Sequence, residues 1–208
     1  MSAADPDFLI QVQLAQTDKN VWSQILAEQR QRLRNMIDTR MDLQVRGRVD
    51  ASDIIQEACL EATQRLPEYL ANPGVPFYIW LRSLTAQRLA LVHRHHLGTK
   101  ARDARREDHE VRRPTPGETS VVMLAALMGQ CSSPSSVAVR QEEKQILEAA
   151  LTELEPIDHE ILVLRHFEEL TNSEVAAALG IKPSAAANRY LRAPERLRTA
   201  LAKWSGSL

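Results

Sequence analysis

The stretch that decides the fold lies near the carboxyl end, where residues 170–192 read LTNSEVAAALGIKPSAAANRYLR. Thr171 and Glu174 have the spacing of a capping box, in which each side chain bonds a backbone amide at the start of a helix. Gly180 suits the left-handed backbone conformation that ends a helix, and Pro183 suits the first turn of the next one. The sequence therefore predicts two helices joined by a tight turn, as in a helix-turn-helix.

The second of these helices is rich in cationic and polar side chains, which suits contact with nucleic acid. When the first turns of such a helix enter the major groove of DNA, arginines can reach guanine edges or phosphates. A helical hairpin within a bundle, with its arginines simply solvated, is the alternative that this pattern leaves open. Pro194 removes a hydrogen bond inside the helix, so we expect a kink there. The candidate DNA-binding residues of this helix are Ser184, Asn188, Arg189 and Arg192.

The charge distribution supports a nucleic-acid partner, although the net charge of the 208-residue chain is only −1. Residues 77–106 carry a net charge of +6 and residues 182–203 one of +5, whereas residues 141–181 carry −8. Basic segments of this kind are typical of phosphate-binding surfaces. The two basic segments therefore favour DNA contact, and the acidic segment between them suits contact with protein.

Apolar residues recur at helical spacing over most of the chain. Glycines number only 7 and β-branched runs are short, so the sequence predicts an all-α protein. A cap at Asp50 or Ser52 predicts one helix that ends near Leu66-Pro67. The other expected helices cover residues 7–16, 21–43, 76–96, 137–154, 157–169, 172–179 and 183–203.

Proline, glycine, serine and charged residues interrupt the helical pattern in the middle of the chain. Residues 113–117 read RPTPG and residues 129–136 read GQCSSPSS, and both compositions are typical of linkers and loops. We therefore expect two helical domains, residues 1–111 and 137–208, joined by a linker over residues 112–136. An apolar piece of that linker, residues 121–128, is expected to pack as a short helix on one domain.

The sequence also excludes several classes of protein. Cys59 and Cys131 are too few for a disulfide framework or a cysteine-rich zinc site, which suits a reducing cytoplasm. No apolar run approaches the roughly 18–20 residues of a membrane span, and the amino terminus lacks the features of a secretory signal. No phosphate-binding loop or nucleophile motif is present, so we expect no catalytic activity and no cofactor. His93, His95 and His96 lack cysteine or acidic partners at helical spacing, which favours surface or phosphate-facing histidines over a metal site.

The helix expected over residues 76–96 combines aromatic residues with arginines. Aromatic rings interleaved with cations suit a protein that holds unstacked, single-stranded bases. Packing in the core is the alternative for Trp80, which lies at the spacing of a buried stripe. The candidate DNA-binding arginines of this helix are Arg82, Arg88 and Arg94. The preceding helix has a polar face at Asp53, Gln56 and Glu57, which is either plain surface or a protein contact.

The order of these parts resembles a known family. Residues 53–58 read DIIQEA, residues 77–81 read FYIWL and lead into arginines, and a linker then precedes the terminal helix-turn-helix. This order is similar to that of bacterial RNA polymerase sigma factors of the sigma-70 family, above all the extracytoplasmic-function type. The resemblance covers about residues 21–106, as sigma region two, and residues 138–203, as sigma region four.

The resemblance implies a transcription initiation factor that binds core RNA polymerase at its β′ clamp and β flap, directs it to specific promoters and aids promoter melting. It implies an anti-sigma factor as a further partner. It implies clamp binding by Asp53, Gln56 and Glu57. For DNA, it implies contact with the promoter element nearest the start site by Arg82, Arg88 and Arg94, and with the more distant element by Ser184, Asn188, Arg189 and Arg192. Gln87, Leu91 and Ala187 differ from the residues that family members often carry, so the resemblance does not fix the promoter sequence.

Two other functions remain open at this point. A two-domain regulator would join the same helix-turn-helix to a ligand-binding or dimerisation domain and would bind duplex DNA without polymerase. A helical adaptor would bind a protein partner through its acidic helices and would not bind DNA.

Overall fold

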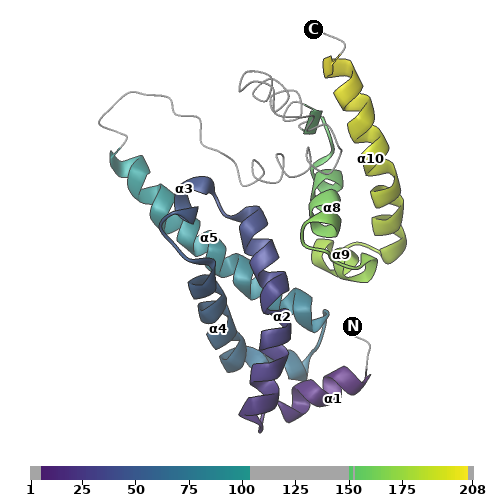
Figure 1. The fold of residues 1–208 in the computed structure, drawn as a ribbon. Helices are drawn as coiled ribbons and strands as arrows, with labels where there is room; N and C mark the ends of the chain where they lie inside the picture. The colour runs from purple at the N-terminus through teal and green to yellow at the C-terminus, as the bar shows by residue number, and fades with distance from the viewer. Residues whose placement is uncertain (1–5, 104–149, 152, 206–208) are drawn as a thin grey trace. The chain divides into compact units, whose positions relative to one another are not determined.

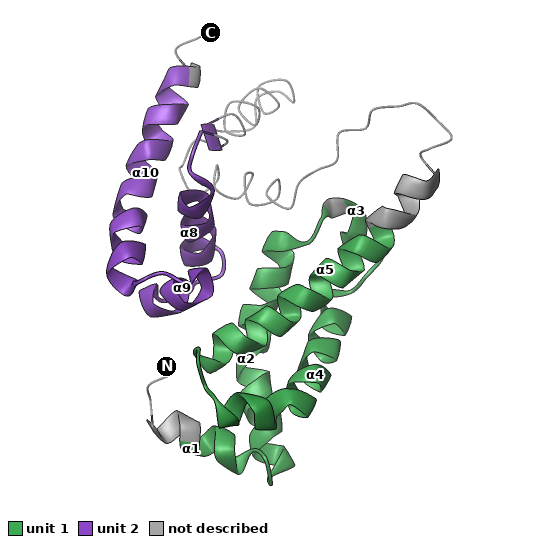
Figure 2. Cartoon of the chain, turned by 180° about the vertical axis from the view of Figure 1, so that it is seen from behind, with its two compact units in different colours: residues 1–113 green, residues 114–208 purple. Residues whose placement is uncertain are grey.

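The computed structural model describes residues 6–103, 150–151 and 153–205, and every regular element in these ranges is an α-helix. The predicted all-α fold is therefore confirmed. The chain divides into two compact units, residues 1–113 and residues 114–208 (Figure 2). The linker expected over residues 112–136, its apolar piece 121–128, and most of the helix expected over residues 137–154 lie outside the described residues.

Unit 1 is a bundle of three long helices, α2 (Lys19–Arg40), α4 (Ala51–Ala71) and α5 (Phe77–Asp103), which pack against one another (Figure 1). The helix α1 (Pro6–Leu14) packs on α2, and the short α3 (Leu43–Arg46) packs on α5. All three long helices contribute to the core, whose largest fully buried side chains include Leu33, Met36, Ile37, Ile54, Ile55, Leu81 and Leu84. The core therefore follows the apolar stripes that the sequence shows at helical spacing.

Aspartate caps fix the starts of helices in unit 1. The side chain of Asp18 accepts a hydrogen bond from the Asn20 amide at 2.8 Å, and that of Asp50 accepts one from the Ser52 amide at 2.8 Å. The Ser52 amide is the main reason why the pKa of Asp50 lies below its ordinary value. Of the two caps expected for α4, Asp50 is thus the one that the structure uses. Asp42 caps α3, a short helix that the sequence pattern did not predict.

An aromatic cluster holds the junction between α4 and α5. Tyr69 stacks on Trp80 with ring centroids 4.7 Å apart and meets Phe77 edge-on at 5.8 Å. Trp80 therefore packs against neighbouring rings, as its helical spacing suggested. The buried ring of Tyr69 also explains why α4 continues through Pro67 to Ala71, because burial of an aromatic side chain in the last turn offsets the hydrogen bond that proline removes.

In its described part, unit 2 contains α8 (Pro156–His166), α9 (Asn172–Leu179) and α10 (Pro183–Ser205), each of which packs on the other two. Its largest fully buried side chains are Ile161, Leu164, Leu170 and Leu197. Ala186 and Ala193 are both 0% exposed, and such small side chains let α10 approach its neighbours closely. The helix α10 runs through Pro194 to Ser205, so this proline does not end it. A kink at that position stays a prediction.

Candidate nucleic-acid interface

The first helix of the helix-turn-helix, α9, begins with the capping box that the sequence predicts. The Thr171 hydroxyl accepts a hydrogen bond from the Glu174 amide at 3.3 Å, and the Glu174 carboxylate accepts one from the Thr171 amide at 2.9 Å. Both interactions satisfy amides that have no partner inside the helix. The start of α9 is therefore set by residues three positions apart.

The turn between α9 and α10 is built on Gly180. Its φ of 65° lies in the left-handed region, which glycine adopts without steric cost. The amide of Ile181 then donates to the carbonyl of Ala176 at 3.0 Å, which closes the carboxyl end of α9. The side-chain amide of Asn172 donates to the carbonyl of Pro183 at 2.9 Å, so the starts of α9 and α10 are joined directly.

One side of α10 faces solvent with side chains suited to DNA contact. Ser184, Asn188 and Arg192 are exposed and follow one another at intervals of four residues, which places them on the same side of the helix. Leu191 lies seven residues after Ser184 and is 70% exposed, so it shares that side. We call Ser184, Asn188, Leu191 and Arg192 the outward face. Within the described part of the chain, none of these four side chains forms a hydrogen bond or ion pair.

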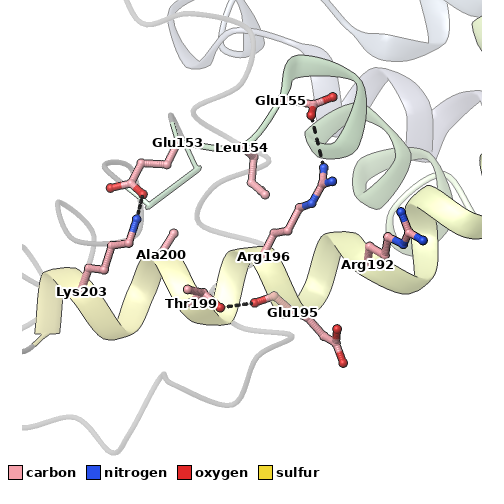
Figure 3. A pocket seen from close by; sticks show the side chains of 9 residues that line it. All are labelled: Glu153, Leu154, Glu155, Arg192, Glu195, Arg196, Thr199, Ala200 and Lys203. Carbon is pink, nitrogen blue, oxygen red and sulfur yellow. Dashed lines mark hydrogen bonds and ion pairs between the residues drawn. The ribbon is translucent and has the colours of Figure 1, made fainter.

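A different side of α10 is tied to the start of α8 by ion pairs. Nη1 of Arg189 lies 2.8 Å from Oε2 of Glu155 and 2.8 Å from Oδ1 of Asp158. Nη1 of Arg196 bonds the other carboxylate oxygen of Asp158 and lies 3.4 Å from Oε1 of Glu155 (Figure 3). We call these four residues the α8–α10 network.

Asp158 is the buried centre of this network. Its side chain is 0% exposed, whereas those of Arg189 and Arg196 are 36% and 45% exposed. Asp158 also lies in the first turn of α8, where the helix dipole favours a negative charge. Hydrogen bonds to Glu155 first and then to Asp158 raise the pKa of Arg189 above its ordinary value. Because a buried carboxylate needs charged partners, Arg189 and Arg196 orient α10 on α8.

The polar face predicted on α4 is present and has an apolar end. Asp53, Gln56 and Glu57 are exposed and lie within about one turn of one another. Leu60 continues the same side of the helix and is 63% exposed. We call these four residues the α4 face. Leu60 and Leu191 were not predicted from the sequence, although each lies three or four residues from a predicted contact residue, and that spacing is the signal that indicates them.

Arg88 of α5 is paired with the acidic side chains of α4. Its Nη2 lies 2.8 Å from Oε2 of Glu61, and its Nη1 lies 3.9 Å from Oε2 of Glu57. Glu61 also pairs with Arg65 at 3.2 Å, and the pKa of Glu61 is lowered chiefly by its hydrogen bond with Arg88. The structure thus brings together Glu57, which was assigned to polymerase, and Arg88, which was assigned to DNA.

The three candidate arginines of α5 do not share one side of that helix. Arg82 is half-buried, Arg88 is half-buried against α4, and Arg94 is exposed. Since they are spaced six residues apart, a regular helix turns each about 120° from the last. The assignment of all three to DNA stays a prediction.

Of the three neighbouring histidines, His93 differs from the sequence expectation of a surface or phosphate-facing side chain. Its Nε2 accepts a hydrogen bond from the Asp42 amide at 3.2 Å, and desolvation lowers its pKa against the opposing effect of the Asp42 charge. The unprotonated nitrogen is therefore used to hold the start of α3. His95 and His96 meet edge-on at 5.1 Å. The described residues hold no cluster of three or more histidine, cysteine or acidic side chains that would bind a metal ion.

The family described as Sigma-70, region 4 matches residues 144–197, a stretch that includes α8, α9 and most of α10. The extracytoplasmic-function (ECF) RNA polymerase sigma factor SigD of Mycobacterium tuberculosis is 28% identical over 181 residues, which cover 87% of this chain and 77% of that protein. The protein of the same name from Mycobacterium bovis has the same identity and coverage. CnrH, solved in complex with the cytosolic domain of CnrY, has a similar fold, with a TM-score of 0.52 over 94% of this chain and 97% of CnrH at 19% identity. Residues 144–197 thus match sigma-70 region 4, and the chain as a whole is similar to ECF sigma factors.

The similarity to sigma factors supports a role in transcription initiation. The region 4 match contains both the outward face of α10 and the whole α8–α10 network, since Glu155 and Arg196 lie within residues 144–197. The resemblance stated from the sequence is therefore confirmed at the level of the family. Among the described residues, no helix combines the length and the apolar character of a membrane span.

Proposed function

We propose that this sigma factor binds core RNA polymerase and directs it to specific promoters, where it also aids the opening of the strands. The observation that carries the proposal is the outward face of α10, a row of exposed side chains on the second helix of a capped helix-turn-helix. The chemistry belongs to the polymerase, so we expect neither catalytic activity nor a cofactor in this chain. We expect it to act in the cytoplasm, where polymerase and chromosome are.

Residues 137–208 are proposed to bind the promoter element farther from the start site. An arginine at position 192 suits a guanine edge, and an amide at position 188 suits an adenine edge. Ser184 at the first turn suits a phosphate or a base. Arg189 is proposed to act at this site mainly by holding α10 on α8, since its Nη1 already bonds two carboxylates. The β flap is the polymerase element that we expect this part to meet.

Residues 1–111 are proposed to dock on the β′ clamp through the α4 face. Asp53 and Glu57 supply negative charge for a cationic partner, and Gln56 supplies hydrogen bonds. Leu60 adds exposed apolar surface whose removal from water would favour binding. The exposed row on α4 is therefore chemically complete as a protein-binding surface.

The arginines of α5 are proposed to contact the promoter element nearest the start site. Side chains that point in three directions cannot all meet one face of a rigid duplex. Separated strands can follow different paths around a helix, so cations on several sides of it suit single strands. The placement of Arg82, Arg88 and Arg94 is therefore better suited to strand opening than to duplex reading.

An anti-sigma factor is proposed as a further partner. The support is that CnrH, which shares this fold, was solved in complex with the cytosolic domain of CnrY. Residues 112–136 are proposed to link the two helical domains across the polymerase.

The proposal is tested by adding the full chain to bacterial core RNA polymerase on a library of random promoter sequences. We expect transcripts from a defined set of start sites that core polymerase alone does not produce. An Asp53→Ala, Glu57→Ala variant should keep its helical content and lose polymerase association, because the α4 face loses both charges. Transcripts with no shared upstream sequence would contradict the proposal.

A regulator that binds duplex DNA without polymerase is the second candidate. It is favoured by one observation, that the outward face of α10 belongs to a helix-turn-helix formed within unit 2 alone. Gel-shift titration of the full chain against the same library distinguishes the two functions. Specific duplex binding without any association with core polymerase would establish the regulator.

A further inference from the structure

Three arginines of α10 lie along one hollow of the surface but differ in their partners. Arg189, Arg192 and Arg196 line a space of about 210 Å³ together with Asn188 and Ala185. Arg192 belongs to the outward face and forms no ion pair within the described residues. Arg189 and Arg196 are instead bonded to Glu155 and Asp158. Two of the three arginines that line this hollow are thus matched by two carboxylates.

The geometry of the match leaves little charge uncompensated. Each carboxylate bonds both arginines, with Nη1 to oxygen distances of 2.8 Å from Arg189 to both acids and 3.4 Å from Arg196 to Glu155. Figure 3 shows Arg196 reaching from α10 to Glu155 and, farther along the helix, Lys203 reaching to Glu153. Opposite charges this close largely cancel as seen from a phosphate backbone.

The arginine side chains nevertheless remain near the surface. Arg189 and Arg196 are 36% and 45% exposed, whereas the Asp158 side chain that holds them is 0% exposed. Removal of the acidic partners would therefore release two cations into a hollow that Arg192 already lines. Released arginines bind phosphates of any sequence, because phosphate contacts carry no base information.

We propose that Glu155 and Asp158 are specificity-determining residues of this sigma factor, which hold Arg189 and Arg196 away from DNA phosphates so that the outward face alone reads the promoter. This inference rests on the proposed function, since it presumes that α10 meets promoter DNA. The two acids act through the arginines and so are positioning residues. They keep sequence-independent binding weak without touching DNA themselves.

The test uses the full chain bound to core RNA polymerase and two labelled duplexes, a promoter recovered from the random library and a scrambled duplex of the same length and composition. Asp158→Asn removes the buried charge at constant size. Glu155→Gln is the second variant, and its fold is secure because the Glu155 side chain is 55% exposed. Glu153→Gln is the matched control, because it makes the same charge change on the Lys203 pair farther along α10. Affinity is measured by fluorescence anisotropy between about 50 and 200 mM salt.

We expect Asp158→Asn to bind the scrambled duplex about threefold to tenfold more tightly at low salt, with a salt slope steeper by about 0.9 for each additional phosphate that the released arginines neutralise. On the promoter, contacts of the outward face with the bases fix the orientation of α10, so the released arginines gain fewer phosphate contacts there than on the scrambled duplex. The ratio of promoter affinity to scrambled affinity should therefore fall. Glu155→Gln should change the scrambled-duplex affinity and the affinity ratio in the same directions, but by less. The Glu153→Gln control should leave the affinity ratio unchanged.

Three results would overturn the inference. Equal losses of affinity for both duplexes would show that the acids only maintain the fold, and an equally large effect in the control would show a general charge effect. An unchanged ratio in both variants, with a wild-type complex that prefers the promoter, would overturn the inference alone. A wild-type complex with no preference would overturn the proposed function itself.

Discussion

Both units tie an arginine that was assigned to DNA to acidic side chains of a neighbouring helix, but the two networks differ in burial. In unit 2 two arginines converge on Asp158, whose side chain is 0% exposed. In unit 1 Arg88 is 34% exposed and pairs with Glu61, which is 18% exposed, and more loosely with Glu57 at 3.9 Å. Exposed pairs contribute little to stability, whereas a buried charge is costly once its partners are lost. Burial, and not the number of charges, therefore separates a pair that holds a helix from one that merely neutralises charge.

The comparison also shows why basic segments overstate the cations available to DNA. Arg88 in unit 1 and Arg189 with Arg196 in unit 2 lie in the two basic stretches of the sequence, yet each has acidic partners in the fold. On the outward face of α10, Arg192 is the cation that has no acidic partner among the described residues. Three predictions test this difference, from the largest expected effect to the smallest, and a fourth concerns the pH dependence of unit 1.

Replacing both arginines, as Arg189→Met with Arg196→Met, should destabilise unit 2 the most. The change strands the buried carboxylate of Asp158, and we expect a loss of about 3 kcal/mol in the free energy of unfolding of unit 2. Hydrogen exchange of the α8 and α10 amides in the full chain measures it. Lys203→Met, which breaks an exposed pair on the same helix, is the control and should change protection by less than about 0.5 kcal/mol. Equal protection in the double variant and the control would show that the buried network around Asp158 stabilises unit 2 no more than the exposed Lys203 pair does.

Arg192→Ala should weaken promoter binding without weakening the fold. Loss of an arginine that is proposed to contact a base is expected to reduce the affinity of the polymerase complex for its promoter by about tenfold to a hundredfold. Anisotropy titration on promoter and scrambled duplexes measures the change, and hydrogen exchange in α10 should remain as in the wild type. If hydrogen-exchange protection of α10 fell while the ratio of promoter to scrambled affinity stayed constant, Arg192 would have a structural role like that of Arg189.

Glu61→Gln should destabilise unit 1 only slightly, because its pairs with Arg88 and Arg65 are partly exposed. We expect about 0.5–1 kcal/mol at neutral pH, and less at high salt. Hydrogen bonding with Arg88 lowers the pKa of Glu61 below its ordinary value of 4.5. The pair's contribution is therefore fully present above about pH 4.5 and is lost as the pH falls through the lowered pKa. A loss as large as that of the arginine double variant in unit 2 would contradict the comparison.

His93 should make the stability of unit 1 slightly pH-dependent, in a higher pH range than Glu61 does. Desolvation lowers the pKa of His93 below its ordinary value of 6.5, so protonation opposes folding. Stability should be complete above about pH 6.5 and should decline as the pH falls through the lowered pKa, by less than about 1 kcal/mol. His93→Gln keeps an acceptor for the Asp42 amide and should remove this dependence, as followed by exchange of amides in α3 and α5. A pH profile identical to that of the wild type would show that His93 is not its source.

The parts of the fold that were predicted well depend on neighbours in the chain. The helix α9 spans Asn172–Leu179, as expected from the capping box and the Gly180 turn, because those signals act over three or four residues. The boundaries that were wrong depend on distant residues. The helix α4 continues beyond Pro67 because Tyr69 stacks on Trp80 of α5. The short helix α3 begins where the Asp42 amide donates a hydrogen bond to His93, 51 residues away.

The candidate site follows the same division. Helical spacing was sufficient to place Asp53, Gln56 and Glu57 on one side of α4, and Ser184 with Asn188 on one side of α10. Exposure of Leu60 and Leu191 was not foreseen, because an apolar residue on a helix is usually taken for core until its neighbours are known. The pairing of Arg88 with Glu61 spans 27 residues and two helices, so no local pattern reveals it.

The clearest contrast is between Arg189 and Arg192, three residues apart on one helix. The sequence predicted the capping box of α9, the turn at Gly180, and the helical and basic character of α10. Hydrogen bonds between near neighbours and side-chain periodicity decide these features. Which arginine is exposed to solvent without an acidic partner among the described residues was decided only by the tertiary structure. The buried alanines Ala186 and Ala193 let α10 pack closely, and that packing brings Arg189 to a carboxylate 31 residues earlier in the chain. Two identical side chains differ in role because charge pairing depends on distances in space, which only the folded packing of α8 against α10 sets.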